Sequence, residues 1–286
     1  MLQDRRVQQL RERVLELAAA VADPTTGDRT YDEYLRWAGQ LYGRYSFGNI
    51  SLILSVRPES QMVSGYRTWR RLGRQVRYGE RGIPIIVPIH GQPVERIDPL
   101  TEEPMLREHI RGWAVKHVFD VAQTDGPPMP NWRTDLGEEA GVLLTAAIDL
   151  AGEHGIEVEF APIYGGTNGV SKGGRMTIND ARPVGIQAAT IMHEIGHERL
   201  HPLATRNAST RAVHECEAEA VAYVVLRHYG YDHVLNGSAR YCQSYGGSAR
   251  QILDSLERIT DVARFLIDGI RCHLPPEFTP PYLNLH

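Results

Sequence analysis

The 286-residue sequence has few cysteines and no long apolar run, and each shortage excludes a class of protein. Its three cysteines are widely spaced and form no CxxC pair, which excludes a disulfide-stapled secreted domain. No stretch approaches the roughly eighteen apolar residues that a transmembrane helix needs. The apolar run near the N-terminus is interrupted by Glu16 and preceded by Asp4 and Glu12, so it predicts an amphipathic helix, not a signal peptide. We therefore expect a cytoplasmic protein with no membrane partner.

The formal net charge of −4 conceals an uneven distribution of charge along the chain. The segment from Arg36 to His90 contains nine arginines and two acidic residues. Residues 134–171, by contrast, contain seven acidic residues and no basic one. Such an asymmetry predicts two units with different partners. The proline-rich segment QTDGPPMPNW, residues 123–132, is the expected linker between them.

Apolar periodicity and turn residues predict an α+β fold in which helices and strands occur in both halves. A stripe of apolar residues predicts the first helix, and proline or glycine marks the ends of several others. The expected helices are residues 7–21, 31–42, 49–56, 66–72, 136–153, 183–200, 211–229 and 249–270. The expected strands are residues 83–90, 113–121, 156–163 and 175–180, with a glycine-rich turn at 164–174 and an extended tail at 275–286.

The segment HEIGH, residues 193–197, predicts a metal site. Residues four apart lie on one face of a helix, so His193 and His197 can bind one ion through their ring nitrogens. Glu194 lies beside them, where it can act as the general base for a metal-bound water, as in zincins. Two ordinary surface histidines are the alternative. We expect Zn²⁺, with Mn²⁺ or Co²⁺ also compatible.

The third ligand is less clear from the sequence, because the metzincin pattern fails at Arg199, where a glycine is required. His201 lies about 12 Å along the helix from the first histidine, so we expect it to cap the helix or support a ligand. The next helix offers Glu215, Glu217 and Glu219. Glu215 and Glu219 share a face, so one can bind the ion while the other holds a histidine N–H. Glu217 points elsewhere and is expected to reach an arginine or solvent, but all three stay candidates on this reasoning.

The basic first half also contains many aromatic residues, between Tyr42 and Gly82. Arginines that neutralise phosphates and aromatic rings that stack on bases are typical of surfaces that bind single-stranded nucleic acid. The alternative is an aromatic core with a solvated arginine face. Composition alone favours this alternative.

Five segments of the chain together resemble a known family, the ArdC-like antirestriction proteins. Four of them are Tyr45–Asn49, Gly65–Trp69, Gly73–Val76 and Gly79–Gly82, and the fifth is VFDVAQTDG at 118–126. They resemble the N-terminal domain of that family, which binds single-stranded DNA (ssDNA). The second half resembles its zincin-like metallopeptidase domain, a relative of the ImmA/IrrE peptidases.

This resemblance implies domains at residues 1–125 and 135–286 and favours Glu215 as the third ligand, with Glu219 supporting a histidine. It also implies a helical and β-hairpin ssDNA-binding domain followed by the peptidase-like domain. Arg81 departs from the family, which more often has lysine there. The implied DNA-binding residues are Tyr45, Asn49, Arg67, Trp69, Arg74, Arg77 and Arg81.

The predicted function is therefore an ssDNA-binding, zinc-dependent metallopeptidase that cleaves proteins on or near DNA. One alternative is a non-catalytic, DNA-binding antirestriction protein with a structural metal. The other is a regulatory peptidase of the ImmA type, whose basic half binds a protein. The protein substrate cannot be named from the sequence.

Overall fold

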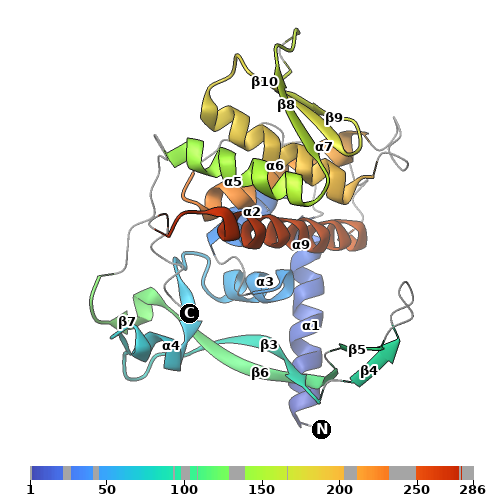
Figure 1. Ribbon diagram of the computed structural model, residues 1–286. Helices are drawn as coiled ribbons and strands as arrows, with labels where there is room; N and C mark the ends of the chain where they lie inside the picture. Colours follow the sequence, from blue (N-terminus) through green and yellow to red (C-terminus); the bar gives the residue numbers. More distant parts are fainter. Residues whose placement is uncertain are drawn as a thin grey trace. The chain divides into compact units, whose positions relative to one another are not determined.

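The computed structural model in Figure 1 shows a mixed α+β protein, as predicted. It describes residues 2–21, 27–40, 45–92, 94–97, 104–107, 109–128, 139–165, 167–202, 211–231, 249–276 and 278. The helices are α1 (Leu2–Val21), α2 (Gly27–Gln40), α3 (Phe47–Val56), α4 (Tyr66–Arg71), the 3₁₀ turn η1 (Val121–Gln123), α5 (Glu139–Glu153), α6 (Val184–Leu200), α7 (Arg211–His228) and α9 (Ala249–His273). The strands are β1 (Val63–Gly65), β2 (Gln75–Val76), β3 (Ile83–His90), β4 (Val94–Ile97), β5 (Pro104–Arg107), β6 (Ile110–Asp120), β7 (Thr124–Asp125), β8 (Glu157–Ala161), β9 (Gly169–Ser171) and β10 (Arg175–Asn179).

Contacts between residues divide the chain into two units. The first contains Met1–Leu17 and Ser51–Gly126, and the second contains Ala18–Ile50 and Pro127–His286. The first unit ends next to the predicted boundary at residue 125. Residues 18–50, however, group with the second unit and not with the first, where the sequence had placed them.

Helix α2 explains this difference, because it packs along α7 inside the second unit. Tyr34 is buried, and its hydroxyl lies 2.9 Å from Oγ1 of Thr260 on α9. Gly39 lies so close to α7 that an added Cβ would be 2.7 Å from Cβ of Arg227. A side chain at residue 39 would therefore separate the two helices.

In the first unit, strands β1, β6 and β3 form an antiparallel sheet with β6 in the centre. Ile83 pairs with Val118, and both side chains are buried on one face of the sheet. Trp69 of α4 packs into the same core, where it is fully buried. Its indole N–H donates a hydrogen bond of 2.9 Å to the carbonyl oxygen of Phe119 in β6. The short helix α4 is thereby fixed to the sheet.

The end of β6 is tied to two other segments through Asp120 and Gln123. The Asp120 carboxylate accepts hydrogen bonds from the backbone N–H groups of Gln61 and Met62, at 2.8 and 3.2 Å. The Gln123 side chain donates to the carbonyl oxygen of Arg81 at 2.9 Å. The polar side chains of segment 118–126 therefore connect β6 to neighbouring segments through hydrogen bonds. These hydrogen bonds explain why polar residues are buried in an apolar core.

The neighbouring strands β2 and β7 pair with each other, and Gly126 closes the end of this ribbon. Gly126 has a φ of 151°, and an added Cβ would lie 2.8 Å from the carbonyl oxygen of Gly73. Both the backbone conformation and the lack of space thus require glycine at residue 126.

The second unit contains the sheet β8-β10-β9, in which β8 runs parallel to β10 and β9 runs antiparallel to it at one edge. Strands β8 and β10 agree with prediction. The sequence missed β9, because its three residues lie within a stretch rich in glycine that is typical of a turn. Helices α5, α6, α7 and α9 pack together beside this sheet. Helix α9 contributes a stripe of fully buried side chains, at Leu256, Ile259, Ala263, Leu266, Ile267 and Ile270.

Parts of the predicted linker and tail, residues 129–132 and 279–286, lie outside the described residues. Among the helices that the structure describes, none is long and apolar enough to cross a membrane.

His228 at the end of α7 makes the stability of the second unit depend on pH. Burial lowers the pKa of its imidazole to about 3, and the charge of Arg271 adds to this effect. The folded state therefore keeps His228 neutral, while the unfolded chain binds a proton below about pH 6.5. Stability is fully present above that pH, and it falls by up to about 1.4 kcal/mol per pH unit as the pH drops from 6.5 toward 3.

We predict that His228→Leu removes this dependence, because leucine has no group to protonate. The free energy of unfolding, measured with urea between pH 7.5 and 4, should fall less steeply for the variant, by about 1.4 kcal/mol per unit. Parallel curves for the two proteins would contradict the assignment.

Candidate metal centre

Helix α6 carries the three residues of the predicted metal motif. It begins after Pro183, and its 17 residues run through His193, Glu194 and His197. His197 and Glu194 are buried, and His193 is partly buried. The two histidines are one turn apart, and their Nε2 atoms lie 3.0 Å from each other. This direct approach of two ring nitrogens fits a shared ion, because both histidines then offer their lone pairs to one point.

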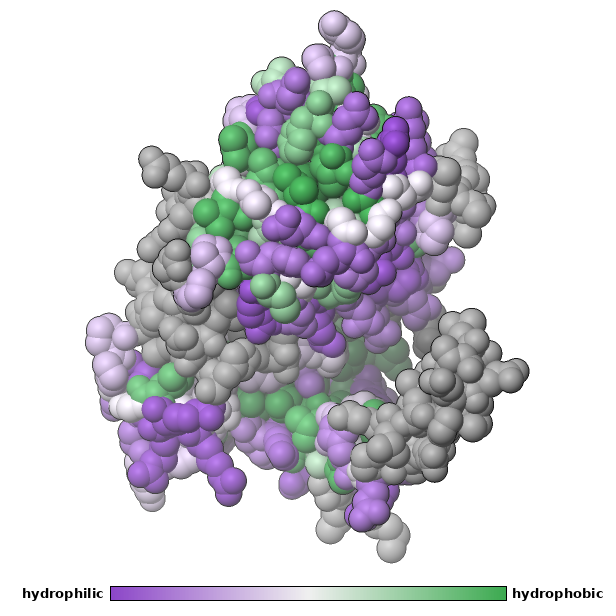
Figure 2. Space-filling model, in the orientation of Figure 1, coloured by the Kyte–Doolittle hydropathy of each residue, from purple (hydrophilic) through white to green (hydrophobic). Residues whose placement is uncertain are grey.

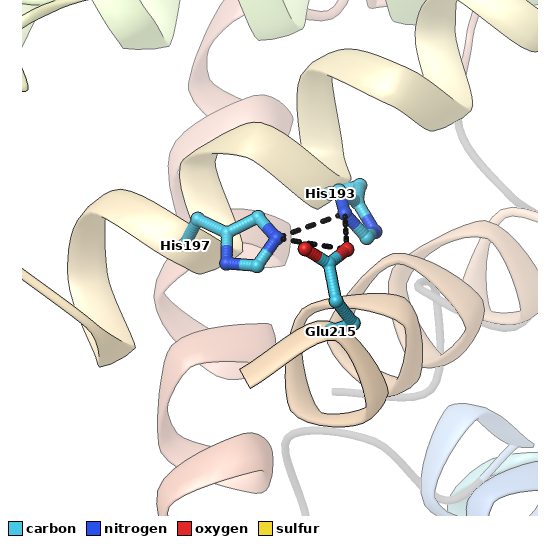
Figure 3. A group of neighbouring side chains, drawn as sticks. All are labelled: His193, His197 and Glu215. Carbon is cyan, nitrogen blue, oxygen red and sulfur yellow. Dashed lines mark hydrogen bonds and ion pairs between the residues drawn. The ribbon is translucent and has the colours of Figure 1, made fainter. Parts of the chain in front are cut away.

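The third member of the group comes from the start of α7, as Figure 3 shows. Oε2 of Glu215 lies 3.5 Å from Nε2 of His193 and 3.5 Å from Nε2 of His197. A tetrahedral zinc ion with ligands at about 2.1 Å keeps its ligand atoms about 3.4 Å apart. The triangle formed by His193, His197 and Glu215 therefore has the size that a tetrahedral ion requires.

A glycine in the motif allows the two helices to come this close. Gly196 faces α7, and an added Cβ would lie 3.3 Å from Cα of Ala218. Because both facing residues are small, the backbones of α6 and α7 meet closely at this point. Glu215 precedes Ala218 by about one turn of α7, and from there its carboxylate reaches the two histidines of α6.

The charges of the group are arranged to attract a cation. Burial lowers the pKa of His193, but hydrogen bonds to Glu215 and Glu219 and the charge of Glu194 outweigh this effect and raise its pKa to about 9. Hydrogen bonds to His193 and His197 hold the pKa of Glu215 well below its usual range. The group thus contains an ionised carboxylate, and its acidic residues favour positive charge at His193, a charge that a bound cation would supply once the ring has lost its proton.

The two other acidic residues of α7 have different roles. Oε2 of Glu219 lies 3.3 Å from Nδ1 of His193, on the side of the ring opposite the shared point. A carboxylate in this place orients the ring and raises its basicity toward a metal. This distance is compatible with the supporting role of Glu219, which stays a prediction.

Glu217 is fully buried and turned away from the metal group. It accepts a hydrogen bond from Ser255 and one of 2.5 Å from Arg258, and its Oε2 lies 3.1 Å from Nε2 of His201. It therefore reaches an arginine, as expected, and it connects α7 to α9. His201 ends α6 by donating its backbone N–H to the carbonyl of His197, which is the capping role predicted for it.

No sequence pattern predicted a role for Glu198, which follows the second histidine. Its carboxylate accepts hydrogen bonds from the Ser171 hydroxyl and from the backbone N–H groups of Gly173 and Gly174, the last two at 3.0 and 3.2 Å. Edge strand β9 and the turn after it are thereby tied to α6. Partners more than twenty residues apart leave no local pattern, so only the fold reveals this contact.

The residues predicted to bind DNA are spread over several environments. Tyr45 and Asn49 are buried and fall in the second contact unit. Arg77 is exposed, but it pairs with Glu80 at 2.8 Å and approaches Asp125 at 3.5 Å. Arg67 and Arg81 are exposed, and their assignment stays a prediction.

Trp69 and Arg74 need a correction, because both are buried in the first unit. The fully buried Trp69 ring has no face available for a base. Arg74 donates from Nε to Oγ1 of Thr124 at 2.7 Å and from Nη2 to the Thr124 carbonyl at 2.9 Å. These two residues hold α4 and β2 in place.

Together, two histidines of an HExxH helix and a glutamate of the next helix define a candidate metal centre. Residues 12–111 match the family model described as the N-terminal domain of anti-restriction factor ArdC. The resemblance to ArdC-like proteins is thereby confirmed over this stretch, which runs from α1 into β6.

Two individual proteins are also similar to the chain, one of them in two crystal structures. A Bacillus anthracis protein described as uncharacterized, pXO2-81, is 23% identical over 272 residues, which cover 80% of this chain and 46% of that protein. The chain therefore spans about half the length of this relative. The metal-free crystal structure of antirestriction protein ArdC from the R388 plasmid is 20% identical, covers 83% of this chain and 91% of its own, and has a TM-score of 0.48. The corresponding values for its Mn(II)-bound structure are 18%, 87%, 96% and 0.49.

We predict that the full-length protein, reconstituted with zinc, manganese or cobalt, holds about one ion per chain at this centre. His193→Ala or His197→Ala should abolish the binding measured by elemental analysis, since each removes one of three ligands. His201→Gln is the matched control on the same helix and should keep the ion. Equal metal loss in all three variants would contradict this ligand set.

We also predict that Arg74→Met destabilises the first unit without changing its affinity for ssDNA. Two hydrogen bonds to Thr124 are lost, which should cost about 1–3 kcal/mol of unfolding free energy. Chemical denaturation measures the first effect, and fluorescence anisotropy with a labelled oligonucleotide measures the second. A stable variant with weakened DNA binding would restore Arg74 as a contact residue.

Proposed function

We propose that this chain is an ssDNA-binding, zinc-dependent metallopeptidase that cleaves proteins on or near single strands. The observation that supports it most is the triangle of His193, His197 and Glu215 with Glu194 on the same helix. A zinc ion held there would polarise a peptide carbonyl and make a bound water acidic.

The exposure of the group favours catalysis over a structural metal. Structural zinc sites are closed by four protein ligands, whereas catalytic sites keep a position open to water. Among the described residues the group has three members, and the Glu215 side chain is 51% exposed. Water and substrate can therefore reach the side of the group that faces away from α6.

Glu194 is the proposed catalytic base. It is buried next to His193, and its charge acts on the pKa of that histidine. In the proposed mechanism its carboxylate takes a proton from the attacking water and delivers it to the leaving amine nitrogen. His193, His197 and Glu215 hold the ion, and Glu219 keeps the His193 ring oriented.

Strand β9 supports a peptide as substrate. It forms an edge of the sheet among the described strands, and Gly169 at its start lies against Thr190, one turn before the metal motif. An extended peptide can add to such an edge through backbone hydrogen bonds. Glu198, which ties the turn after β9 to α6, would keep this edge at a fixed distance from the catalytic helix.

The N-terminal ArdC match and the arginine-rich first half support ssDNA as the second partner. In this proposal the DNA brings the peptidase to proteins bound on the same strand. The alternatives are a DNA-shielding protein with a non-catalytic metal and a peptidase whose basic half binds protein.

The test compares Glu194→Gln with Glu215→Gln in the full chain, with metal and with or without ssDNA. Cleavage of the protein itself or of an ssDNA-bound protein is followed by gel electrophoresis and mass spectrometry. Glu194→Gln should keep the ion and the DNA affinity but lose about 10²–10⁴-fold in cleavage rate, because it removes the base alone. Glu215→Gln should lose both metal and activity, because an amide is a poor substitute for an anionic ligand.

Full activity of Glu194→Gln would refute the proposed mechanism. A wild-type protein that cleaves nothing under any of these conditions, and whose Glu194→Gln variant still protects DNA from a restriction nuclease, would favour the DNA-shielding alternative.

A further inference from the structure

The exposed residues of α4 form a basic and aromatic surface, of which only Arg67 is among the predicted DNA-binding residues. This six-residue helix follows β1 directly, and Trp69 fixes it to the sheet from below. At about 100° per residue, Arg67 and Arg71 fall opposite Trp69, whereas Arg70 and Tyr66 lie about 100° and 60° from it, so the four side chains span an arc of about 140°. All four side chains are exposed, whereas Trp69 is buried. We call these four residues the α4 patch.

The three arginines of the α4 patch are available for an external anion. Arg67, Arg70 and Arg71 form no ion pair within the part of the chain that the structure describes. Arg77, a few residues away, is different, because Glu80 and Asp125 already neutralise it. In Figure 2, hydrophilic residues gather where Figure 1 labels α4 and β7. Three guanidinium groups on less than two helical turns, without an ion pair to any described residue, fit a polymer with closely spaced negative charges.

Tyr66 adds an aromatic face in a fixed orientation. Its side chain is 42% exposed, and its hydroxyl accepts a hydrogen bond of 2.9 Å from the Gln75 amide. Its ring meets Phe119 edge to face, with centroids 6.5 Å apart. The ring is thus held on two sides while it stays open to solvent. Stacking on such a ring costs little entropy, because its rotamer is set before a ligand arrives.

We infer that the α4 patch is the surface that contacts ssDNA, with Tyr66 stacking on a base and Arg67, Arg70 and Arg71 binding adjacent phosphates. This inference rests on the proposed ssDNA binding and assigns it to residues. Alternating charge and ring contacts match the backbone and bases of a single strand. A duplex hides its base faces, so Tyr66 would have no stacking partner there. The buried Trp69 and Arg74 then act as the support of the surface.

The test uses the full-length protein and a fluorescein-labelled oligothymidylate of about 25 nucleotides, long enough for one binding site. Fluorescence anisotropy gives Kd at several salt concentrations. The triple variant Arg67→Ala, Arg70→Ala, Arg71→Ala should bind the oligonucleotide more weakly. The slope of log K against log salt concentration should also become less negative by about 2, because each lost phosphate contact removes about 0.7 from it. The matched control is Arg5→Ala, Arg6→Ala, Arg13→Ala, which removes the same charge from exposed positions of α1 and should leave the slope unchanged.

Two substitutions of Tyr66 separate stacking from hydrogen bonding. Tyr66→Leu should raise Kd by about 5- to 150-fold, since it removes the ring. Tyr66→Phe keeps the ring and should stay within about twofold of the wild type. Thermal unfolding of the arginine variants should match the wild type, because these side chains are exposed. Tyr66→Leu also loses the contact with Phe119 and the hydrogen bond from Gln75, so its Kd is measured below its own unfolding transition. If the alanine triple variant unfolds early, it is replaced by Arg67→Gln, Arg70→Gln, Arg71→Gln, which tests the same charges.

The possible outcomes separate a failure of the α4 patch from a failure of the proposed ssDNA binding. Unchanged binding by the triple variant, or an equal loss in the α1 control, overturns the α4 patch and leaves ssDNA binding in place. A wild-type protein that does not bind the oligonucleotide overturns both. Equal affinity for duplex, or competition by polyglutamate as strong as that by unlabelled oligothymidylate, also overturns the inference, in favour of a duplex or an acidic protein partner.

Discussion

The close approach of α6 and α7 is the contact on which the candidate metal centre depends. Gly196 and Ala218 face each other there, and a side chain at residue 196 would crowd the backbone of α7, since an added Cβ would lie 3.3 Å from Cα of Ala218. At this separation Glu215 lies 3.5 Å from the ring nitrogens of both His193 and His197. The buried carboxylate of Glu217 holds the same helix to α9 through Arg258 and Ser255. Backbone contact thus sets the ligand distances, and a buried ion pair keeps the helix from shifting.

In the first unit, too, buried polar residues fix the position of a surface that is exposed to solvent. Trp69, Arg74 and Asp120 lie inside and make hydrogen bonds to the backbone of β6, β7 and the segment before β1. None of them is available to a large ligand. What they stabilise is the position of α4 and of the loops around it. Residues that identify the family by sequence are therefore the support of the proposed DNA surface, and the contact residues lie beside them.

The metal motif could be predicted from the sequence because its information is local: residues four apart on one helix share a face, whatever the rest of the fold. The choice of Glu215 over Glu217 could not be made from spacing alone, since it depends on the rotation of α7 against α6 and α9. Helices and the long strands β3 and β6 agree with their apolar patterns, but β9 and its tie to Glu198 do not follow from any local pattern. Burial of Trp69 and Arg74 was also beyond prediction, because both residue types occur in cores and on nucleic-acid surfaces.

The most direct test of the account is X-ray absorption spectroscopy at the zinc edge of the reconstituted full-length protein. We expect two imidazole nitrogens, one carboxylate oxygen and one water oxygen around the zinc ion, at about 2.0–2.2 Å. Glu215→Gln should alter the oxygen contribution and keep the imidazole signal. A spectrum with sulfur at about 2.3 Å, or with no imidazole scattering, would contradict a centre built from His193, His197 and Glu215.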